Sequence, residues 1–259
     1  MNSSDPVVAL SSGVPMPLVG FGTWQIRGRE AESAVRTALD AGYRLIDTAT
    51  VYRNEAQVGR AVASSGIDRR DLFITTKLPP ELAGRERQTI SASLDALELD
   101  YIDLWLVHWP PAARHIEPTW ERLLEIRDEG LAVSVGVSNY SMDEIDRLIA
   151  ATAEAPTVNQ VPWAPSLFDP EFLAASRERG IVVEGYSPFN NTDLSDPRLV
   201  AIASHHGVTA AQVVLRWHVQ HEVVAIPKSA TPERIVANFD VFGFELTEEE
   251  MRIVDAMRT

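Results

Sequence analysis

Short apolar runs alternate along the chain with longer stretches whose apolar residues recur at helical spacing, as in AESAVRTALDAG and DEIDRLIAATAE. The short runs favour buried strands, and the periodic stretches favour amphipathic helices. Eight strands are expected, at residues 19–24, 43–47, 72–77, 102–108, 132–138, 157–161, 181–187 and 222–228. Strands that alternate with helices in this way predict a parallel sheet.

Glycine and polar residues mark the expected ends of the helices. Three glycines precede strands, where a left-handed helix C-cap favours glycine: Gly42, Gly130 and Gly180. Four polar residues precede helical stretches and are suitable N-caps: Ser141, Asp169, Thr209 and Thr231. The pattern of strands and helices therefore has consistent boundaries.

A small hairpin is expected over residues 7–18, with Ser12 and Gly13 at its turn. No linker, low-complexity tract or break in composition divides the 259 residues. Barrels of alternating strands and helices commonly reach about 250 residues as one unit. We therefore predict an α/β fold with a single domain over residues 1–259. The domain is a (β/α)8 TIM barrel with an N-terminal β-hairpin and extra helices near the C-terminus.

Composition limits the classes of partner. The formal net charge of −14 argues against a nucleic acid or an anionic membrane, because both require a basic surface. The chain has no cysteine, which excludes disulfides and a thiolate nucleophile and fits a reducing compartment. It shows neither a signal-peptide pattern nor an apolar run long enough to span a membrane. We expect a cytoplasmic monomer that acts on a small molecule.

Polar residues at strand ends are the candidates for chemistry, because barrels of this type carry their active sites at the C-terminal ends of the strands. Asp47 and Tyr52 follow the second strand, Lys77 ends the third, and His108 ends the fourth. Further polar residues mark the later strands: Ser138, Asn139, Gln160, Tyr186, Ser187, Lys228 and Ser229. Seven consecutive strands thus contribute to one face.

These residue types suit the reduction of a carbonyl, which needs a hydride donor for the carbon and a proton for the oxygen. Tyr52 is the candidate acid, and Lys77 would stabilise its phenolate. One positive charge at about 4 Å lowers a pKa by roughly three units before opposing effects. Asp47 would keep a partly buried Lys77 charged. His108 would orient the substrate oxygen and at low pH could share in proton delivery.

Each of these four residues also has an ordinary structural role. Asp47 can cap the next helix, and Tyr52 can be a surface aromatic. Lys77 can extend its charge from a strand end, and His108 can be a hydrogen-bonded core residue. Structural roles give no reason for all four to converge on one barrel mouth, so their joint placement favours catalysis.

The contexts LIDTA, VYRNE, TTK and LVHWP resemble the four-residue catalytic signature of the aldo-keto reductase family. The segments VGFGTWQ, GVSNY, NQV, GYSP and IPKSATPERIVANFDVFGFELTEEEM resemble family segments in the same order, from about residue 7 onward. The chain is most similar to the short prokaryotic group that includes 2,5-diketo-D-gluconate reductases. The resemblance implies an NADPH-dependent oxidoreductase that reduces small aldehydes, α-dicarbonyls or keto-sugars such as 2,5-diketo-D-gluconate to alcohols.

The anionic end of the cofactor is expected after the eighth strand. Thr231 and Pro232 open a helix there, so backbone N–H groups and the positive end of the helix dipole would face an anion. Lys228 and Arg234 flank this end and suit a 2′-phosphate, unless they belong simply to a solvated helix start. The pattern favours NADPH over NADH, with NADH as the alternative.

The resemblance implies further cofactor contacts. Asn238 would contact the adenine, Tyr186 would stack on the nicotinamide, and Ser187 would help to hold the pyrophosphate. Three residues would hold the carboxamide: Ser138, Asn139 and Gln160. The complete expected set is Gly22, Thr23, Trp24, Asp47, Ser138, Asn139, Gln160, Tyr186, Ser187, Pro188, Ile226, Lys228, Ser229, Thr231, Arg234 and Asn238.

Departures from the family pattern concern the substrate and the adenosine. Residues 162–165 read Pro-Trp-Ala-Pro where Glu-x-His-Pro is common, and residues 78–80 read Leu-Pro-Pro where Leu-Trp is common. Both predict an altered pocket wall. Ala237 stands where a glutamate near the adenosine is usual. Because the sequence stops at Thr259, we expect an open pocket with weak discrimination. Its expected lining is Trp24, Val51, Tyr52, His108, Trp109 and Phe189.

Other functions remain as alternatives. A glycoside hydrolase could use Asp47 and Glu184 as its carboxylate pair, but it would not need Lys77 beside Tyr52. A cofactor-binding regulatory subunit on the same fold is a second alternative. No metal site is expected, because four histidines show no ligand spacing with carboxylates at the strand ends: His205, His206, His218 and His221.

Overall fold

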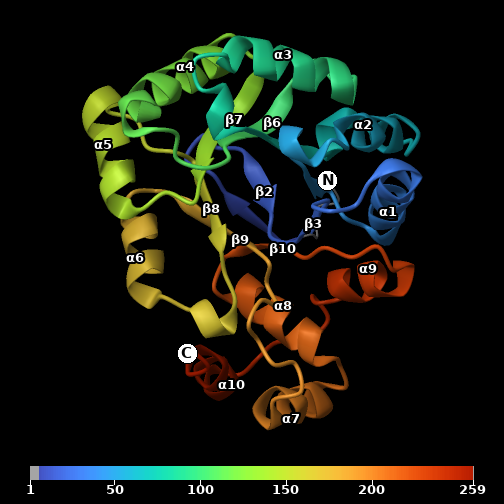
Figure 1. Cartoon of the computed structure of the whole chain (residues 1–259). Coiled ribbons are helices and arrows are strands. Elements are labelled where there is room, and N and C mark those ends of the chain that lie inside the picture. Colours follow the sequence, from blue (N-terminus) through green and yellow to red (C-terminus); the bar gives the residue numbers. More distant parts are fainter. Residues whose placement is uncertain (1–5, 259) are drawn as a thin grey trace.

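Eight parallel strands form a barrel in the computed structural model, which describes residues 6–258 (Figure 1). Their order in space follows the chain from β3 to β10. The strands are β3 Gly20–Gly22, β4 Leu45–Asp47, β5 Phe73–Leu78, β6 Ile102–Val107, β7 Ala132–Ser138, β8 Val158–Pro162, β9 Val182–Tyr186 and β10 Val224–Ile226. Each overlaps one predicted strand, and the first and last are shorter than predicted. The (β/α)8 TIM barrel is confirmed.

Backbone contacts between the first and last strands close the barrel. Val19 and Ala225 form a parallel bridge, and the Gly22 N–H donates to the Pro227 oxygen at 3.1 Å. A Cβ atom at Gly20 would lie 2.1 Å from Leu45 Cδ2. A larger residue at position 20 would therefore push the strands apart.

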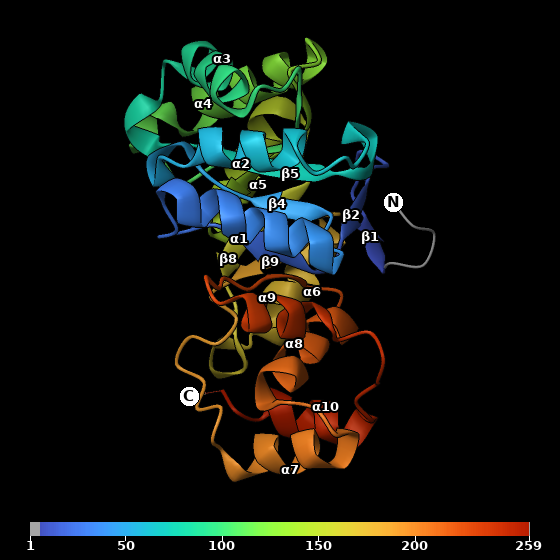
Figure 2. The ribbon, with the colours of Figure 1, turned by 90° about the vertical axis from the view of Figure 1, so that its right-hand side faces the viewer.

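Helices surround the strands on all sides in the view of Figure 1. They are α1 Gly28–Ala41, α2 Glu55–Ala63, α3 Glu86–Leu97, α4 Ile116–Asp128, α5 Met142–Thr152, α6 Pro170–Glu178, α7 Pro197–His206, α8 Ala210–Gln220, α9 Pro232–Phe239 and α10 Glu248–Asp255. Two helices separate β9 from β10, and two more follow β10. Figure 2 shows α7 and α10 together at one end of the molecule, as the predicted extra helices near the C-terminus.

The predicted helix boundaries are confirmed with one exception. The three predicted C-cap glycines all have positive φ: Gly42, Gly130 and Gly180. Three predicted N-cap side chains accept hydrogen bonds from the first turn of their helices: Ser141, Asp169 and Thr209. Thr231 occupies the N-cap position of α9 but makes no side-chain cap. There the Thr231 N–H instead donates to Ser229 Oγ at 3.0 Å, in a turn ahead of the helix.

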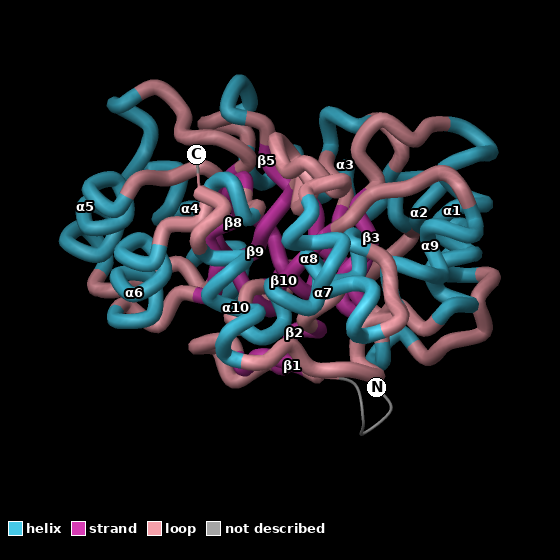
Figure 3. Tube along the Cα trace, turned by 90° about the horizontal axis from the view of Figure 1, so that it is seen from below, coloured by secondary structure: helices cyan, strands magenta, loops and turns pink. Residues whose placement is uncertain are grey.

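The predicted hairpin is also present, as strands β1 Val7–Ala9 and β2 Pro15–Pro17. Its turn spans residues 11–13, and Gly13 adopts a φ of 82°. Ser12 Oγ lies 2.8 Å from Ser134 Oγ on β7, and Met16 is fully buried. Figures 2 and 3 show the hairpin to one side of the barrel strands. It covers the end of the barrel at which the strands begin.

Two hydrophobic clusters make up the core. The larger joins the barrel wall to the helices from α1 to α5 and to α9. The second lies between β9 and the helices α6, α7, α8 and α10, and includes Leu173, Leu199, Val213, Trp217 and Val254. None of the described helices has both the length and the apolar character that crossing a lipid bilayer requires.

Candidate active site

A pocket of about 700 Å³ opens at the C-terminal ends of the barrel strands. This volume is typical of sites that bind small molecules. Every predicted substrate residue lines it: Trp24, Val51, Tyr52, His108, Trp109 and Phe189. So do ten further predicted cofactor residues: Gly22, Asp47, Ser138, Asn139, Gln160, Tyr186, Ser187, Pro188, Ile226 and Lys228.

Five predicted cofactor residues lie outside the pocket lining. Thr23 is fully buried, and its hydroxyl donates to the Asp47 backbone oxygen at 2.9 Å. The other four continue from the pocket rim at Lys228 into the start of α9: Ser229, Thr231, Arg234 and Asn238. They can meet only a ligand that extends from the pocket toward α9.

The sequence did not predict three of the residues that line the pocket: Gln25, Asn190 and Asn191. Each lies in a loop after a strand, where no apolar periodicity marks a position as pocket-facing. Gln25 and Asn191 have positive φ values of 62° and 51°. A polar residue in a loop that needs a left-handed backbone was the one available signal.

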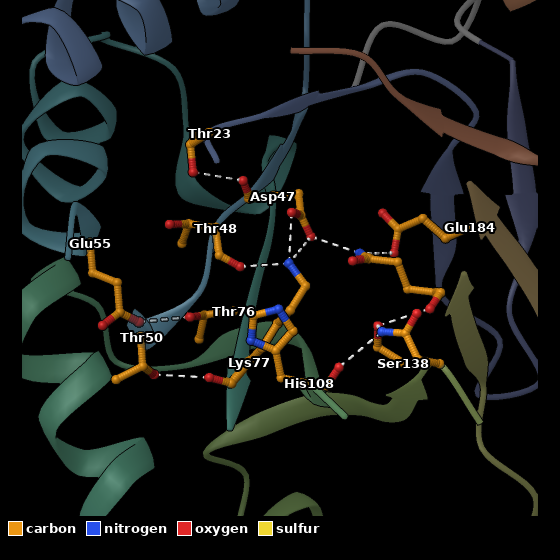
Figure 4. A network of polar contacts seen from close by, with 12 residues as sticks. Thr23, Asp47, Thr48, Thr50, Glu55, Thr76, Lys77, His108, Ser138 and Glu184 are labelled. Atoms are coloured by element: carbon orange, nitrogen blue, oxygen red, sulfur yellow. Dashed lines mark hydrogen bonds and ion pairs between the residues drawn. The ribbon is translucent and has the colours of Figure 1, made fainter. Parts of the chain in front are cut away.

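Lys77 is fully buried on β5, and its ammonium group makes three contacts (Figure 4). Nζ lies 2.7 and 2.6 Å from the two carboxylate oxygens of Asp47 and 2.8 Å from the Thr48 backbone oxygen. Burial opposes the charge of Lys77, but the charge and hydrogen bonds of Asp47, together with Tyr52 and Glu184, outweigh this effect and raise the Lys77 pKa. Helix α2 has Asn54 at its N-cap position, so Asp47 is not its cap.

Tyr52 ends a short helical turn, Thr50–Tyr52, between β4 and α2. Lys77 Nζ lies 5.3 Å from the centroid of its ring. Burial raises the pKa of Tyr52 more than the charge of Lys77 lowers it, and Asp47 raises it further. The lowering that the sequence predicts is thus present but is outweighed. Tyr52 holds its proton at neutral pH, as a proton donor must.

His108 directly follows β6, with its ring edge-on to Tyr52 at a centroid distance of 5.7 Å. Burial, and then the charge of Lys77, lower the His108 pKa to about 3. The imidazole is therefore neutral under ordinary conditions. A share of His108 in proton delivery would therefore require a pH near or below this lowered pKa. A neutral ring N–H can still donate a hydrogen bond to a substrate oxygen.

Gln160 and Glu184 extend the network across the barrel interior. Gln160 Nε2 donates to Asp47 Oδ2 and to Glu184 Oε2, both at 2.8 Å. Glu184 is fully buried, and its other oxygen has no hydrogen-bond partner among the described residues. Burial, followed by the negative charge of Asp47, raises the Glu184 pKa. Glu184 does not line the pocket, so it does not form the hydrolase pair with Asp47.

The backbone is strained at two strand ends that line the pocket. Asn139 after β7 and Ser187 after β9 have φ values of 64° and 53°. Asn139 Nδ2 donates to Ser138 Oγ at 2.9 Å, and Asn139 Oδ1 accepts from the Tyr186 hydroxyl at 2.9 Å. Non-glycine residues in this conformation concentrate at functional sites, where neighbouring contacts hold them.

The two sequence departures do not alter the pocket wall, contrary to the prediction. None of residues 78–80 or 162–165 belongs to the pocket lining. Trp163 is buried in the second hydrophobic cluster, with its ring 6.0 Å from that of Phe168. Side chains alternate between the two faces of a strand, so Trp163 points away from the face that carries Gln160.

The chain matches known proteins over nearly its whole length. The model of the aldo/keto reductase family matches residues 18–259. Morphine 6-dehydrogenase from Pseudomonas putida is 43% identical, with 100% of this chain and 93% of that protein covered. An aldo-keto reductase from Mycolicibacterium vanbaalenii is 43% identical, with coverages of 97% and 92%.

The same family appears among solved structures. A crystal structure of an aldo/keto reductase from Brucella melitensis superposes with a TM-score of 0.95 at 40% identity. It covers 98% of this chain and 100% of its own. Family members use nicotinamide cofactors in carbonyl chemistry. Three of the four signature residues, Asp47, Tyr52 and His108, line the pocket, and the fourth, Lys77, is hydrogen-bonded to Asp47 behind it. The chain belongs to the aldo/keto reductase family and is an oxidoreductase of the class that reduces carbonyls with NAD(P)H.

Proposed function

We propose that this protein reduces aldehydes and ketones to alcohols with NADPH, and that Tyr52 is the general acid. The observation that carries the proposal is the buried pair of Asp47 and Lys77 directly behind Tyr52, at the base of the pocket. A buried lysine held charged beside a protonated tyrosine serves no evident need of the fold. It does serve a proton donor that must become an anion.

The residues divide the chemistry among them. The nicotinamide cofactor supplies the hydride that the carbonyl carbon receives. Tyr52 donates the proton to the carbonyl oxygen, and the positive charge of Lys77 stabilises the phenolate that results. His108, being neutral, donates a hydrogen bond to the same oxygen and orients it. Asp47 keeps Lys77 charged and fixed in position through two hydrogen bonds.

The pocket residues fit a nicotinamide. Gln160 directs both N–H groups at carboxyl oxygens, which leaves its own oxygen to accept from a carboxamide. Ser138 and Asn139 add polar groups beside it, and the ring of Tyr186 offers a flat apolar surface. We assign the nicotinamide end of the cofactor to this part of the pocket.

The start of α9 fits a phosphate. No side chain caps this helix, so the positive end of its dipole is open to an anion. Pro232 has no N–H, and the Arg234 N–H donates to the Thr231 oxygen at 3.1 Å, which leaves the Glu233 N–H for the anion. Lys228 at the pocket rim and Arg234 in the first turn supply positive charge on an otherwise acidic chain. We assign the 2′-phosphate of NADPH to this position, with Ser229, Thr231 and Asn238 as further contacts.

The proposed substrates are small aldehydes and α-dicarbonyls, and also keto-sugars, as in the 2,5-diketo-D-gluconate reductase-like group. Three large apolar side chains at the pocket are unusually exposed: Trp24 at 52%, Val51 at 46% and Trp109 at 50%. These walls favour a carbonyl carried on an apolar group. The similarity to morphine 6-dehydrogenase from Pseudomonas putida adds morphine as a compound to test in the direction of alcohol oxidation with NADP+. We propose a cytoplasmic monomer without nucleic-acid or membrane partners.

Replacing Tyr52 by phenylalanine tests the acid. Tyr52→Phe should lower kcat/KM about 10²- to 10⁴-fold, because it removes the proton donor but not the ring. The measurement follows NADPH oxidation with a panel of aldehydes, diketones and keto-sugars, alongside NADPH binding by fluorescence. Tyr140→Phe is the matched control, because Tyr140 is buried but does not line the pocket.

Two results would change the conclusion. Full activity in Tyr52→Phe would remove Tyr52 from the role of acid. A wild-type protein that binds NADPH but turns over no member of the panel would favour the regulatory subunit.

Replacing Arg234 tests the preference for NADPH. Arg234→Ala should weaken NADPH binding about 10-fold and leave NADH binding nearly unchanged, because only NADPH carries the 2′-phosphate. Arg252→Ala, on the exposed surface of α10, serves as the control. Equal losses for both cofactors would contradict the assignment of Arg234.

A further inference from the structure

The last turn of α7 places two neighbouring histidines against the first turn of α10, outside the barrel (Figure 2). His205 Nδ1 lies 2.9 Å from Glu250 Oε1. His206 Nε2 lies 3.0 and 2.9 Å from the two oxygens of the same carboxylate. Each residue therefore offers one donor atom, and the three atoms lie within 4.8 Å of one another.

We propose that His205, His206 and Glu250 form a binding site for a divalent transition-metal ion such as Zn²⁺. Zinc binds histidine nitrogen and carboxylate oxygen at about 2.0–2.2 Å, so two ligands of one tetrahedral ion lie roughly 3.3 Å apart. The observed nitrogen–oxygen separations of 2.9–3.0 Å are within a few tenths of an ångström of this value. The two histidine nitrogens lie within 4.8 Å of each other, so the exposed His205 ring would have to move toward His206 to bring all three ligands around one ion, with water as the fourth ligand.

Glu250 is held in place independently of the histidines. Its Oε2 accepts hydrogen bonds from the backbone N–H and the hydroxyl of Thr247, at 2.8 and 3.0 Å, in the capping box of α10. Outer contacts of this kind orient metal ligands and strengthen binding.

The burial and packing of the three side chains also suit a partly enclosed transition-metal ion. The side chains of His206 and Glu250 are only 14% and 11% exposed, whereas His205 is 68% exposed and leaves a path for entry. The ring of His206 packs on Phe244 at 5.3 Å. The C-terminal end of a helix such as α7 favours a positive charge. Two imidazole ligands favour Zn²⁺ over Mg²⁺ or Ca²⁺, which prefer oxygen.

The expected role of this site is stability rather than turnover. The ion would join α7 to α10, the two helices that lie outside the ring around the barrel. The sequence did not predict the site because Glu250 lies 44 residues after His206, and adjacent histidines match no common ligand spacing. The prediction of no metal site rested on spacing alone.

Zinc titration of the tag-free protein, after treatment with a chelator, tests the proposal. We expect binding of one ion per chain by calorimetry. The Tm should rise by roughly 5–10 °C when Zn²⁺ is present at about 100 times its dissociation constant. Mg²⁺ and Ca²⁺ should have no such effect, and kcat/KM for carbonyl reduction should not change.

Variants distinguish a metal site from an ordinary hydrogen-bonded cluster. His206→Ala and Glu250→Gln should each weaken Zn²⁺ binding by at least about 10-fold. Glutamine is also accepted at this position of a capping box, so Glu250→Gln keeps the start of α10 intact. His221→Asn is the matched control, because His221 pairs with the single carboxylate of Asp255 at 2.8 Å. Wild type without stoichiometric binding, or undiminished binding in Glu250→Gln, would overturn the proposal.

Discussion

Two ion pairs, one fully buried and one partly buried, lie at opposite ends of the barrel strands. At the mouth, Lys77 on β5 pairs with Asp47 on β4 at 2.6 Å, with side-chain exposures of 0% and 3%. At the other end, Arg69 precedes β5 and pairs with Asp103 on β6 at 2.5 Å, with exposures of 20% and 11%. The two pairs are chemically alike, but their remaining contacts differ.

Arg69 and Asp103 form the lower pair, and their other hydrogen bonds are to backbone groups. Arg69 donates to the oxygens of Leu72 and Tyr101 at 2.9 and 3.0 Å, and the Ile74 N–H donates to Asp103 at 2.8 Å. These contacts hold together the segments that lead into neighbouring strands. Lys77 and Asp47 form the upper pair, which instead lies beside Tyr52, His108 and the pocket. The lower pair is therefore suited to stability and the upper pair to chemistry, as is general for the two ends of such barrels.

Removing the cation from each pair gives the largest expected difference. Lys77→Met should destabilise the fold by about 3–5 kcal/mol, because it leaves the buried charge of Asp47 without a cation. It should also lower kcat/KM at least about 10²-fold. Arg69→Met should cost less stability, about 1–3 kcal/mol, because its pair is partly hydrated. The folded Arg69→Met protein should keep wild-type kcat/KM.

Urea unfolding and kinetics measured well below the midpoint check both variants. If folded Arg69→Met loses as much activity as Lys77→Met, the division between the two ends of the barrel is wrong.

The second expected effect concerns Glu184, the buried carboxyl group that Gln160 links to the upper pair. Glu184 has a raised pKa in the folded protein, through burial and then Asp47. Above the unfolded pKa of about 4.3, the folded state keeps a proton that the unfolded state releases, so stability falls as pH rises toward the folded pKa. Glu184→Gln cannot ionise and still accepts from Gln160. It should raise stability at pH 7 by more than about 1 kcal/mol and have little effect at pH 4.

Thermal unfolding between pH 4 and about pH 8 measures this gain, which should increase with pH over the window set by the raised pKa. Glu245→Gln, at a side chain that is 82% exposed, is the control and should show no such trend. A gain that is the same at every pH would show that ionisation of Glu184 is not the cause.

The smallest expected effects come from two buried serines on the same strand, β7. Ser134 Oγ lies 2.8 Å from Ser12 Oγ at the lower end, and Ser138 Oγ donates to the backbone oxygen of Gln160 at 2.8 Å at the mouth. Ser134→Ala and Ser138→Ala should each cost about 1 kcal/mol of stability. Only Ser138→Ala should raise the KM for NADPH. An equal rise in the KM for NADPH in Ser134→Ala would contradict the proposed difference between the two ends of the barrel.

The strand ends were predictable because strands buried on both faces read as continuous apolar runs. Against such runs, Asp47, Lys77 and His108 stand out, and the rule for barrel active sites then brings them together. The helix caps were predictable because they depend only on nearby residues: the side chains of Ser141 and Thr209 accept hydrogen bonds from the first turns of their own helices.

Contacts between distant segments could not be predicted. Gln160 donates a hydrogen bond to Asp47, which lies 113 residues earlier in the sequence, and no sequence pattern predicts this bond. The pKa of Tyr52 depends on how deeply the folded protein buries it, which the sequence does not state. Trp163 was assigned to the pocket wall by analogy, whereas it directly follows β8, points away from the face that carries Gln160 and lies in the second hydrophobic cluster.

The chain contains two lysines, Lys77 and Lys228, and its other permanent cations are arginines. Lys77 is sealed in the barrel, whereas Lys228 stands exposed at the rim of the pocket. An amine-reactive label would therefore find one accessible lysine side chain in the described chain, placed where the cofactor phosphate is proposed to bind. Bound NADPH should therefore slow the labelling of Lys228, so that the rate of labelling would report whether the pocket is filled.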